Sequence, residues 1–307
     1  MSLKGFVKVE RRMADRTIKM LQSRGYFDSD YEIRHEGDYV LIPVKDGFTG
    51  PVVVKDAEKK PKVIPASGSF DIIGTIAITK KDDVEFAKEI LKTHKNIKSV
   101  YLDKGVKGKE RIRDLVLLAG IDSTVALYRE NGCIFKIDVS KSYFSPRLAT
   151  ERRRLVDSIL DGEFIVDMFA GSGPISIEVA KKRRVKIISI DINCAAIESL
   201  QESMRLNSLL GTITPICGDA RQLIKDIHDA DRIIMNHPTD AFSFLPCALE
   251  ALKYGGHINY YEILNKDDVT KRLADFNFMR LKVFSYHRVH SYSKLSDLIS
   301  FDLIREG

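Results

Sequence analysis

The clearest hydrophobic pattern in the chain is a short apolar run, followed by a polar turn and then by helical spacing. Residues 164–166 are apolar, Asp167 follows them, and Gly171 and Gly173 lie in the turn. From Ile175 onward, apolar residues recur at the spacing of a helix. This order of buried strand, glycine turn and helix predicts the opening unit of a doubly wound α/β sheet.

Three further apolar runs follow, and they end in Asp191, Asp219 and Asn236. The carboxyl ends of parallel strands meet at one edge of a sheet, so we expect these polar residues to surround one ligand. Gly171 and Gly173 let a ligand approach the backbone closely, and the following helix offers free N–H groups at its N-terminus.

The ligand that this pattern favours is S-adenosylmethionine (SAM). A dinucleotide fingerprint needs a third glycine, and Ser176 occupies that position. Asp167 is placed to meet a cationic ligand, Asp191 to bind ribose hydroxyls and Asp219 to lie near an adenine. An NAD-dependent oxidoreductase on the same sheet is the alternative from another enzyme class. The missing glycine and the Asn-x-Pro sequence at Asn236 argue against it.

The remaining pattern predicts two small α+β domains before a Rossmann-type SAM-dependent methyltransferase domain. The predicted domains span residues 1–62, 70–145 and 146–307, with a charged linker over 55–62. The expected elements are a helix over 12–24 and strands over 31–34 and 39–43, then a strand pair over 70–78, a helix over 83–94 and strands between 99 and 138. Ser145 or Thr150 is expected to cap a helix that runs from Glu151 toward Leu160.

Composition narrows the functional classes. The 307 residues carry a net charge of +6, and the pI of about 8.9 is compatible with a nucleic-acid partner. We expect no signal peptide and no membrane span, because no apolar run is long enough. Four scattered cysteines without a Cys-x-x-Cys pair argue against a zinc site and a disulfide framework, and suit a reducing cytoplasm. A monomer is the default expectation.

The segment 104–113 is strongly basic. It carries five cations and two glycines, which predicts a flexible basic loop. Its charge is explained either by solvation alone or by contacts with phosphate or RNA. The five cations are Lys104, Lys107, Lys109, Arg111 and Arg113.

Two motifs carry a resemblance to a known family. The sequence Phe-Ser-x-Arg-Leu-x-x-Glu-Arg at 144–152 precedes the glycine turn at 167–174, and Arg-Ile-Arg at 111–113 is followed by Leu-Leu-Ala-Gly at 117–120. With these motifs the chain resembles the archaeal and eukaryotic tRNA (guanine-37-N1)-methyltransferases. The resemblance runs from about Phe70 to the C-terminus and includes the N-terminal unit.

A related aminocarboxypropyl transferase of the wybutosine pathway shares the fold but lacks the Asn-x-Pro sequence present here at 236–238. Two departures from the family pattern are visible. Lys294 stands where relatives often have a proline, and His237 and Thr239 stand where leucine and lysine are expected.

The resemblance implies a SAM-dependent enzyme that methylates N1 of guanine 37, beside the anticodon of tRNA. The N-terminal domain would touch the outer corner of the tRNA. The implied SAM site consists of Arg152, Asp167, Phe169, Gly171, Gly173, Asp191, Ile192, Asp219, Ala220 and Asn236. The implied RNA contacts are Lys104, Lys107, Lys109, Arg113 and Arg147.

The chemistry assigns roles to three residues. Guanine N1 carries a proton at neutral pH, so its methylation needs a base, and Glu151 is the candidate, with a raised pKa that burial by a closing RNA would provide. Pairing of Glu151 with one of Arg152 to Arg154 is the alternative interpretation. Arg111 would stabilise charge on O6, because a guanidinium forks onto a purine edge, and a contact with phosphate is the alternative role. Asn236 would hold the base edge.

Tyr143 and Phe144 either pack against a flipped base or belong to the core. The sulfonium of SAM needs no metal, so no metal site is expected. Methylation of the tricyclic wyosine precursor at the same tRNA position, and an RNA-binding protein without catalysis, remain alternatives.

Overall fold

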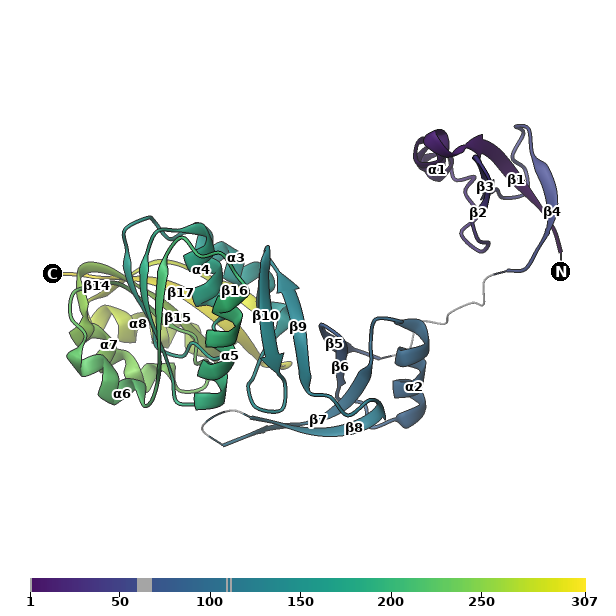
Figure 1. Ribbon diagram of the computed structural model, residues 1–307. Helices are drawn as coiled ribbons and strands as arrows, with labels where there is room; N and C mark the ends of the chain where they lie inside the picture. Colours follow the sequence, from purple (N-terminus) through teal and green to yellow (C-terminus); the bar gives the residue numbers. More distant parts are fainter. Residues whose placement is uncertain (1, 60–67, 109, 111) are drawn as a thin grey trace. The chain divides into compact units, whose positions relative to one another are not determined.

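The computed structural model describes residues 2–59, 68–108, 110 and 112–307. They form two compact units, Met1–Pro65 and Ala66–Gly307 (Figure 1). The predicted linker over 55–62 is wrong in its first part, because Lys55 lies inside strand β4, Val53–Ala57. Residues 60–62 of that prediction lie outside the described residues.

The first unit is a four-stranded antiparallel sheet with one helix. Its strand order is β2-β3-β1-β4. The elements are β1 Ser2–Glu10, α1 Ala14–Ser23, β2 Arg34–Glu36, β3 Tyr39–Pro43 and β4. Leu21 of α1 packs with Val40 and Ile42 of β3, which explains the apolar spacing of the predicted helix.

The pattern missed two strands of this unit and misplaced a third. The strand expected over 31–34 is wrong, because β2 begins only at Arg34. Strand β1 is not apolar on alternate positions, since Lys4 is buried and its amino group lies 2.6 Å from the Asp28 carboxylate. A buried ion pair of this kind interrupts the alternation by which a strand is recognised.

The second unit begins with a four-stranded sheet of order β5-β6-β7-β8. Its elements are β5 Phe70–Ile73, β6 Ile76–Thr79, α2 Val84–Thr93, β7 Ser99–Lys107 and β8 Ile112–Gly120. The flexible loop predicted over 104–113 is wrong for most of its length, because β7 and β8 extend into it as paired strands. Lys109 and Arg111 lie outside the described residues.

A hairpin of β9 Val125–Glu130 and β10 Cys133–Asp138 connects this sheet to the rest of the unit. Phe135 and Ile137 of β10 share one apolar core with Leu155 of α3, Ala149–Asp157, and Ile177 of α4, Pro174–Lys182. Residues 70–145 and 146–307 therefore belong to one compact unit, and the boundary between them stays a prediction.

Helix α3 begins differently from the expectation. A 3-10 turn over Pro146–Leu148 leads into it, and neither Ser145 nor Thr150 caps it, since its N-cap is Leu148 without a side-chain cap. Pro146 at the first position fixes the backbone for the turn, so the chain enters the helix without a capping side chain.

The centre of the second unit is a seven-stranded sheet of order β13-β12-β11-β14-β15-β17-β16. The first five strands in this order run parallel, and β17 and β16 form an antiparallel hairpin beside them. The strands are β11 Phe164–Asp167, β12 Lys186–Asp191, β13 Thr212–Cys217, β14 Ala230–Met235, β15 Leu252–Asn265, β16 Leu281–Ser291 and β17 Ser296–Arg305.

Two apolar cores cover this sheet. Helices α3, α4 and α5, Cys194–Arg205, contribute to one core, and α6, Ala220–Leu223, α7, Leu245–Ala251, and α8, Val269–Phe278, to the other. Figure 1 shows α4 and α5 beside the β9–β10 hairpin, with α6, α7 and α8 on the other side of the strands. No helix among the described residues has the length and apolar character to cross a membrane.

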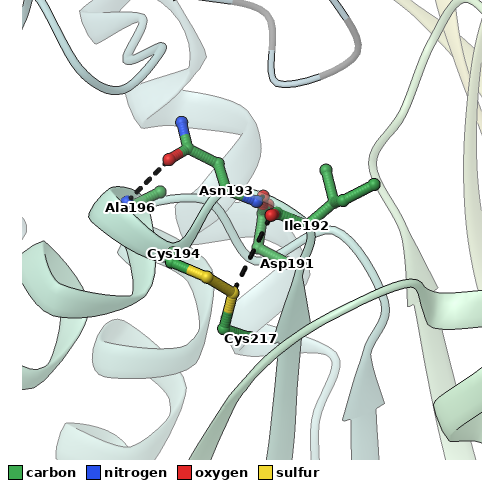
Figure 2. The surroundings of a disulfide bond; sticks show 6 residues. All are labelled: Asp191, Ile192, Asn193, Cys194, Ala196 and Cys217. Carbon is green, nitrogen blue, oxygen red and sulfur yellow. Dashed lines mark hydrogen bonds between the residues drawn. A yellow bond between two sulfur atoms is a disulfide. The ribbon is translucent and has the colours of Figure 1, made fainter.

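A disulfide links Cys194, the first residue of α5, to Cys217, the last residue of β13. Figure 2 shows it beside Asp191, Ile192 and Asn193. The two Cα atoms lie 5.1 Å apart. The expectation from the scattered cysteines was wrong at this point, because residues distant in sequence meet at adjacent strand ends. Cys133 and Cys247 are free.

The disulfide is expected to stabilise the fold. It closes a loop with a sequence separation of 23, for which the loss of chain entropy in the unfolded state corresponds to about 3 kcal/mol. Cys217→Ser should lower the free energy of unfolding by about this amount in denaturant titrations without reductant. Reductant should lower the wild-type value to the same level. Cys247→Ser is the control, and equal stability of the two variants would contradict the expectation.

Candidate active site at the carboxyl ends of the parallel strands

A cavity of about 520 Å³ lies at the carboxyl ends of β11, β12, β13 and β14. Eight of the predicted SAM-site residues line it: Arg152, Phe169, Gly171, Asp191, Ile192, Asp219, Ala220 and Asn236. The remaining two, Asp167 and Gly173, are not part of this lining. The parallel strands thus bring together residues that are spread over 85 positions of the sequence, from Arg152 to Asn236.

The glycine turn is shaped for close backbone approach. Gly171 and Gly173 have φ values of +55° and +75°, a region that other residues adopt only with strain. A Cβ on Gly173 would lie 2.2 Å from Cδ1 of Leu200 in α5, whereas a Cβ on Gly171 would meet nothing within 4 Å. Gly173 therefore permits helix packing, and Gly171 leaves open space at the cavity.

Asp191 is held rigidly at the end of β12. Its carboxylate accepts hydrogen bonds from the backbone N–H of Gly171 (2.7 Å) and of Asn193 (2.9 Å). Burial raises the pKa of Asp191, and these two N–H groups partly offset that increase. Asn193 in turn caps α5 and donates to the Lys141 carbonyl at 2.7 Å. The carboxylate is thus presented to the cavity in one orientation.

Asp219 lies just beyond β13, because that strand ends at Cys217 and not at the predicted position 219. Its carboxylate caps helix α6 through the backbone N–H of Arg221, at 2.8 Å. Arg221 lies over the ring of Phe244 at 3.8 Å. Asp219 is therefore a fixed acceptor on the rim of the cavity.

Aromatic rings form one wall. The ring centroids of Phe169 and His237 are 4.9 Å apart, and those of Phe169 and Phe244 are also 4.9 Å apart. Asn236 and Pro238 line the cavity on either side of His237. This wall combines apolar rings with an amide that can both donate and accept, which suits a heterocyclic ligand.

Arg152 reaches the cavity from α3 and is anchored by acidic residues. Its guanidinium donates to both carboxylate oxygens of Glu130, at 2.6 and 2.7 Å, and to the Ser145 carbonyl at 3.1 Å. Glu178 is fully buried nearby, and burial together with the Glu130 carboxylate raises its pKa to about 8. Neither glutamate was recognised in the sequence, because each lies on a different element with no local motif.

Glu151 does not line the cavity, and its carboxylate is saturated with donors. Arg154 (2.8 Å) and the Tyr261 hydroxyl (2.9 Å) donate to Oε1, and His287 lies 2.8 Å from Oε2. Burial alone would raise the pKa of Glu151, but these partners outweigh it and lower the pKa. The raised pKa expected on burial by a closing RNA stays a prediction, and the alternative of pairing with Arg154 is what the structure contains.

The predicted RNA-contacting cations are placed unequally. Arg113 is buried, donates to Asp103 (2.6 Å) and to the Phe144 carbonyl (3.0 Å), and stabilises the sheet, so it is not available to phosphate. Lys107 and Arg147 are exposed, although ion-paired at 2.6 and 2.7 Å with Asp114 and Asp71. Lys104 is exposed. Lys109 and Arg111 lie outside the described residues.

Tyr143 and Phe144 both line the cavity. Phe144 is buried and belongs to the core, whereas Tyr143 is 39% exposed, and its packing against a flipped base stays a prediction. The sequence also missed Glu110, His290 and Tyr292 in the lining. Glu110 lies in the turn between β7 and β8, His290 near the end of β16, and Tyr292 directly after that strand.

The residues present fit a SAM molecule. Within the described residues, the buried Oδ1 of Asp167 and Oγ of Ser172 have no hydrogen-bond partner in the turn that holds Gly171. Carboxylates stand at two further strand ends, and Gly171 leaves the space that a side chain would fill. No group of three or more His, Cys, Asp or Glu side chains in the described part of the chain is arranged to hold a metal ion.

Asp167 provides a pH-dependent test of this geometry. Burial and the charge of Asp191 raise its pKa to about 7, while the Ser176 hydroxyl donates to it at 2.8 Å. A raised carboxyl pKa means that the folded state binds the proton more tightly than the unfolded chain. The free energy of unfolding should therefore fall as the pH rises from about 4 through about 7. In Asp167→Asn that decline should become shallower, and an unchanged slope in chemical denaturation would contradict the assignment.

Comparisons with known proteins agree with this site. Residues 126–286 match the TRM5/TYW2 methyltransferase domain, and residues 7–52 match the tRNA methyltransferase 5 N-terminal domain. The chain is 39% identical over 282 residues to the tRNA (guanine(37)-N(1))-methyltransferase Trm5b of Pyrococcus abyssi, covering 83% of each chain. It is 36% identical over 226 residues to the tRNA 4-demethylwyosine(37)-methyltransferase Taw21 of Saccharolobus solfataricus, covering 72% of this chain and 86% of the relative.

A solved structure extends the similarity to the whole chain. The structure of the complex of aTrm5 and tRNALeu is similar with a TM-score of 0.75 and 30% identity, and the match covers 98% of this chain and 99% of that one. The match to the methyltransferase domain spans more than half of the 307 residues. The chain therefore belongs to the TRM5/TYW2 methyltransferase family.

Proposed function

We propose that the protein is a tRNA (guanine-37-N1)-methyltransferase that transfers the methyl group of SAM to N1 of guanine 37. The observation that carries the proposal is the cavity at the strand ends. It joins the predicted SAM-site residues to the Asn-x-Pro loop at 236–238 and to the 143–152 segment, within reach of a second, planar ligand. Family membership and the tRNA-bound relative support the same reaction.

In the proposal, SAM lies along the four strand ends and supplies a methyl group activated by its sulfonium charge. Asp191 binds the ribose hydroxyls and Asp219 lies near the adenine, because both carboxylates are fixed by backbone N–H groups. Gly171 lets the ligand approach the turn, and Arg152, anchored by Glu130, faces the charged end of the ligand. Rigid acceptors of this kind supply the alignment that in-line transfer requires.

The base for guanine N1 is proposed to be Glu151. Its lowered pKa keeps it ionised and able to accept a proton. Because its oxygens are occupied by Arg154, Tyr261 and His287, it acts only after one donor gives way. His287 is the candidate, since its side chain is 37% exposed whereas Tyr261 is 2% exposed. Entry of the N1–H donor would replace the imidazole at Oε2.

Arg111 is retained in the proposal as the group that stabilises charge on O6, and Asn236 as the group that holds the base edge. Gly108 and Glu110, which lie between β7 and β8 and near Arg111 in the sequence, line the cavity. Of the predicted phosphate contacts, Lys104, Lys107, Lys109 and Arg147 remain. The N-terminal unit is proposed to contact the tRNA away from the target base. We also propose that the protein is a monomer and that it acts in the cytoplasm.

A second candidate function keeps the same site and changes the target base. The 4-demethylwyosine methyltransferase among the relatives acts at tRNA position 37 as well. The loop residues His237 and Thr239 line the cavity and depart from the family pattern, so they are where a larger tricyclic base would be accommodated. Competition between guanine-37 and 4-demethylwyosine-37 tRNA separates the two functions.

Labelled methyl transfer tests the proposal and its residues. Transcripts with guanine at position 37 should accept methyl groups, and transcripts with adenine should not. Single-turnover rates should fall by about 10²- to 10⁴-fold in Glu151→Gln and by about 10²- to 10³-fold in Arg111→Ala. Glu250→Gln, a substitution on helix α7, is the control. EDTA should leave the rate unchanged, since the transfer needs no metal.

Absence of transfer to guanine 37, with transfer to 4-demethylwyosine 37, would reject the first function in favour of the second. Wild-type rates in Glu151→Gln would reject that residue as the base while leaving the reaction itself intact.

SAM binding should depend on Asp191. SAM should raise the melting temperature of the wild type, because it binds only the folded state, and NAD should not. Asp191→Ala should lose most of this shift, since it removes the acceptor for ribose. Asp161→Ala, at an exposed position in the turn before β11, should keep the shift. Stabilisation by NAD instead of SAM would contradict the assignment.

A further inference from the structure

The segment from Leu281 to Ser296 contains no acidic residue, although 43 of the 307 residues are Asp or Glu. It carries three cations and two histidines among exposed aromatic side chains. The cations are Lys282, Arg288 and Lys294, the histidines are His287 and His290, and the aromatic residues are Phe284, Tyr286 and Tyr292. We call residues 281–296 the acid-free segment.

The acid-free segment is open to solvent. It consists of β16, which pairs only with β17 at the edge of the seven-stranded sheet, and of the turn that follows. Phe284 is 72% exposed, Tyr286 50% and Tyr292 60%. Tyr286 stacks on the buried Phe301 with ring centroids 5.6 Å apart, which holds one ring face in place. The segment thus presents fixed aromatic surface on a strand edge.

Its cations are largely uncommitted. None of the described residues forms an ion pair with Lys282 or Lys294, and Arg288 approaches Asp297 only at 3.9 Å. From Lys282 to Arg288 the strand advances by about 20 Å. Positive charge is therefore spread along the edge, and only that of Arg288 has an acidic partner, Asp297, at the limit of an ion pair.

The segment is continuous with the active-site cavity. His290 and Tyr292 line the cavity, and His287 contacts Glu151 at 2.8 Å. Backbone hydrogen bonds from Tyr292 and Ser293 to the Ser296 carbonyl, at 3.0 and 2.9 Å, fix the turn. The ring of Tyr292 is consequently held at the rim, partly in the cavity and partly in solvent.

We propose that the acid-free segment binds the single-stranded RNA that flanks the target base, with Tyr292 stacking on a neighbouring base and the three cations contacting phosphates. Sequence-tolerant binding of single strands combines these two features, aromatic platforms and a positive path along the backbone. This inference rests on the proposed function, because the RNA beside the target base lies at the acid-free segment only when the target base occupies the cavity.

A polyanion explains the segment better than a protein partner does. Protein interfaces place aromatic residues in a core that is depleted of charge, whereas here cations alternate with the rings and no acidic residue offers a salt bridge to a partner. The position at the cavity rim also matches a target base that must leave its stack to be reached.

Tyr292 provides the sharpest test. The dissociation constant for tRNA with guanine at position 37 should rise by about 5- to 150-fold in Tyr292→Ala, the effect of losing one stacked base. Tyr292→Phe should keep wild-type affinity, because stacking needs only the ring. The matched control is Tyr254→Ala, because Tyr254 is also exposed (67%) and lies near the amino end of β15, outside the acid-free segment. The SAM dissociation constant, measured in parallel, separates RNA binding from damage to the cavity.

The proposed phosphate contacts of the cations are tested by measuring tRNA affinity at several salt concentrations. The slope of log affinity against log salt should decrease by about one for each of Lys282→Ala, Arg288→Ala and Lys294→Ala. Lys186→Ala, at the amino end of β12, should leave the slope unchanged.

The outcomes separate the inference from the proposed function. If the wild type does not bind and methylate the tRNA, the proposed function fails. If the wild type does both, and Tyr292→Ala and the three cation variants behave like Tyr254→Ala and Lys186→Ala, the function stands and this inference is overturned. A loss of SAM affinity in Tyr292→Ala without a loss of tRNA affinity would also overturn it.

Discussion

The parallel pairing of β11, β12, β13 and β14 is the constraint on which the active site depends. Because the strands point the same way, their carboxyl ends meet at one edge, and the residues that follow them surround one cavity. Gly173 makes this arrangement possible, since any side chain there would collide with Leu200 and push α4 away from α5. The Cys194–Cys217 disulfide ties the same edge together a few residues from Asp191 and Asp219. Packing, covalent linkage and the cavity lining thus converge on one edge of the sheet.

Buried charge organises the second half of the site. Arg152 is anchored by Glu130, and Glu151 is held by Arg154, Tyr261 and His287. Two adjacent residues of one helix therefore face different networks, one toward the cavity and one toward β15 and β16. A carboxylate with this many donors is ionised but occupied. In the proposed mechanism, RNA displaces the half-exposed imidazole of His287, and this contact connects the edge strand β16 to the proposed base.

Much of the fold and of the candidate site was predictable from the sequence, and the features that were missed have physical reasons. Short apolar runs that end in Asp191 and Asn236 predicted the strands and the cavity, because an apolar run followed by a polar residue is a local pattern that marks the end of a buried parallel strand. Glu151 was singled out by a motif, but its partners Tyr261 and His287 lie 110 and 136 positions away and carry no signal of their own. The disulfide was missed for the same reason. Strand β1 was not predicted, because a lysine in the sequence suggests an exposed position, whereas the side chain of Lys4 is buried in an ion pair.

In the proposed reaction, this cavity delivers a methyl group to one atom of one nucleotide. The most direct measurement is nuclease digestion and mass spectrometry of a guanine-37 transcript after incubation with the protein and SAM. We expect N1-methylguanosine at position 37 and at no other position. A methyl group on another atom or another nucleotide, or no modification despite bound SAM, would contradict it.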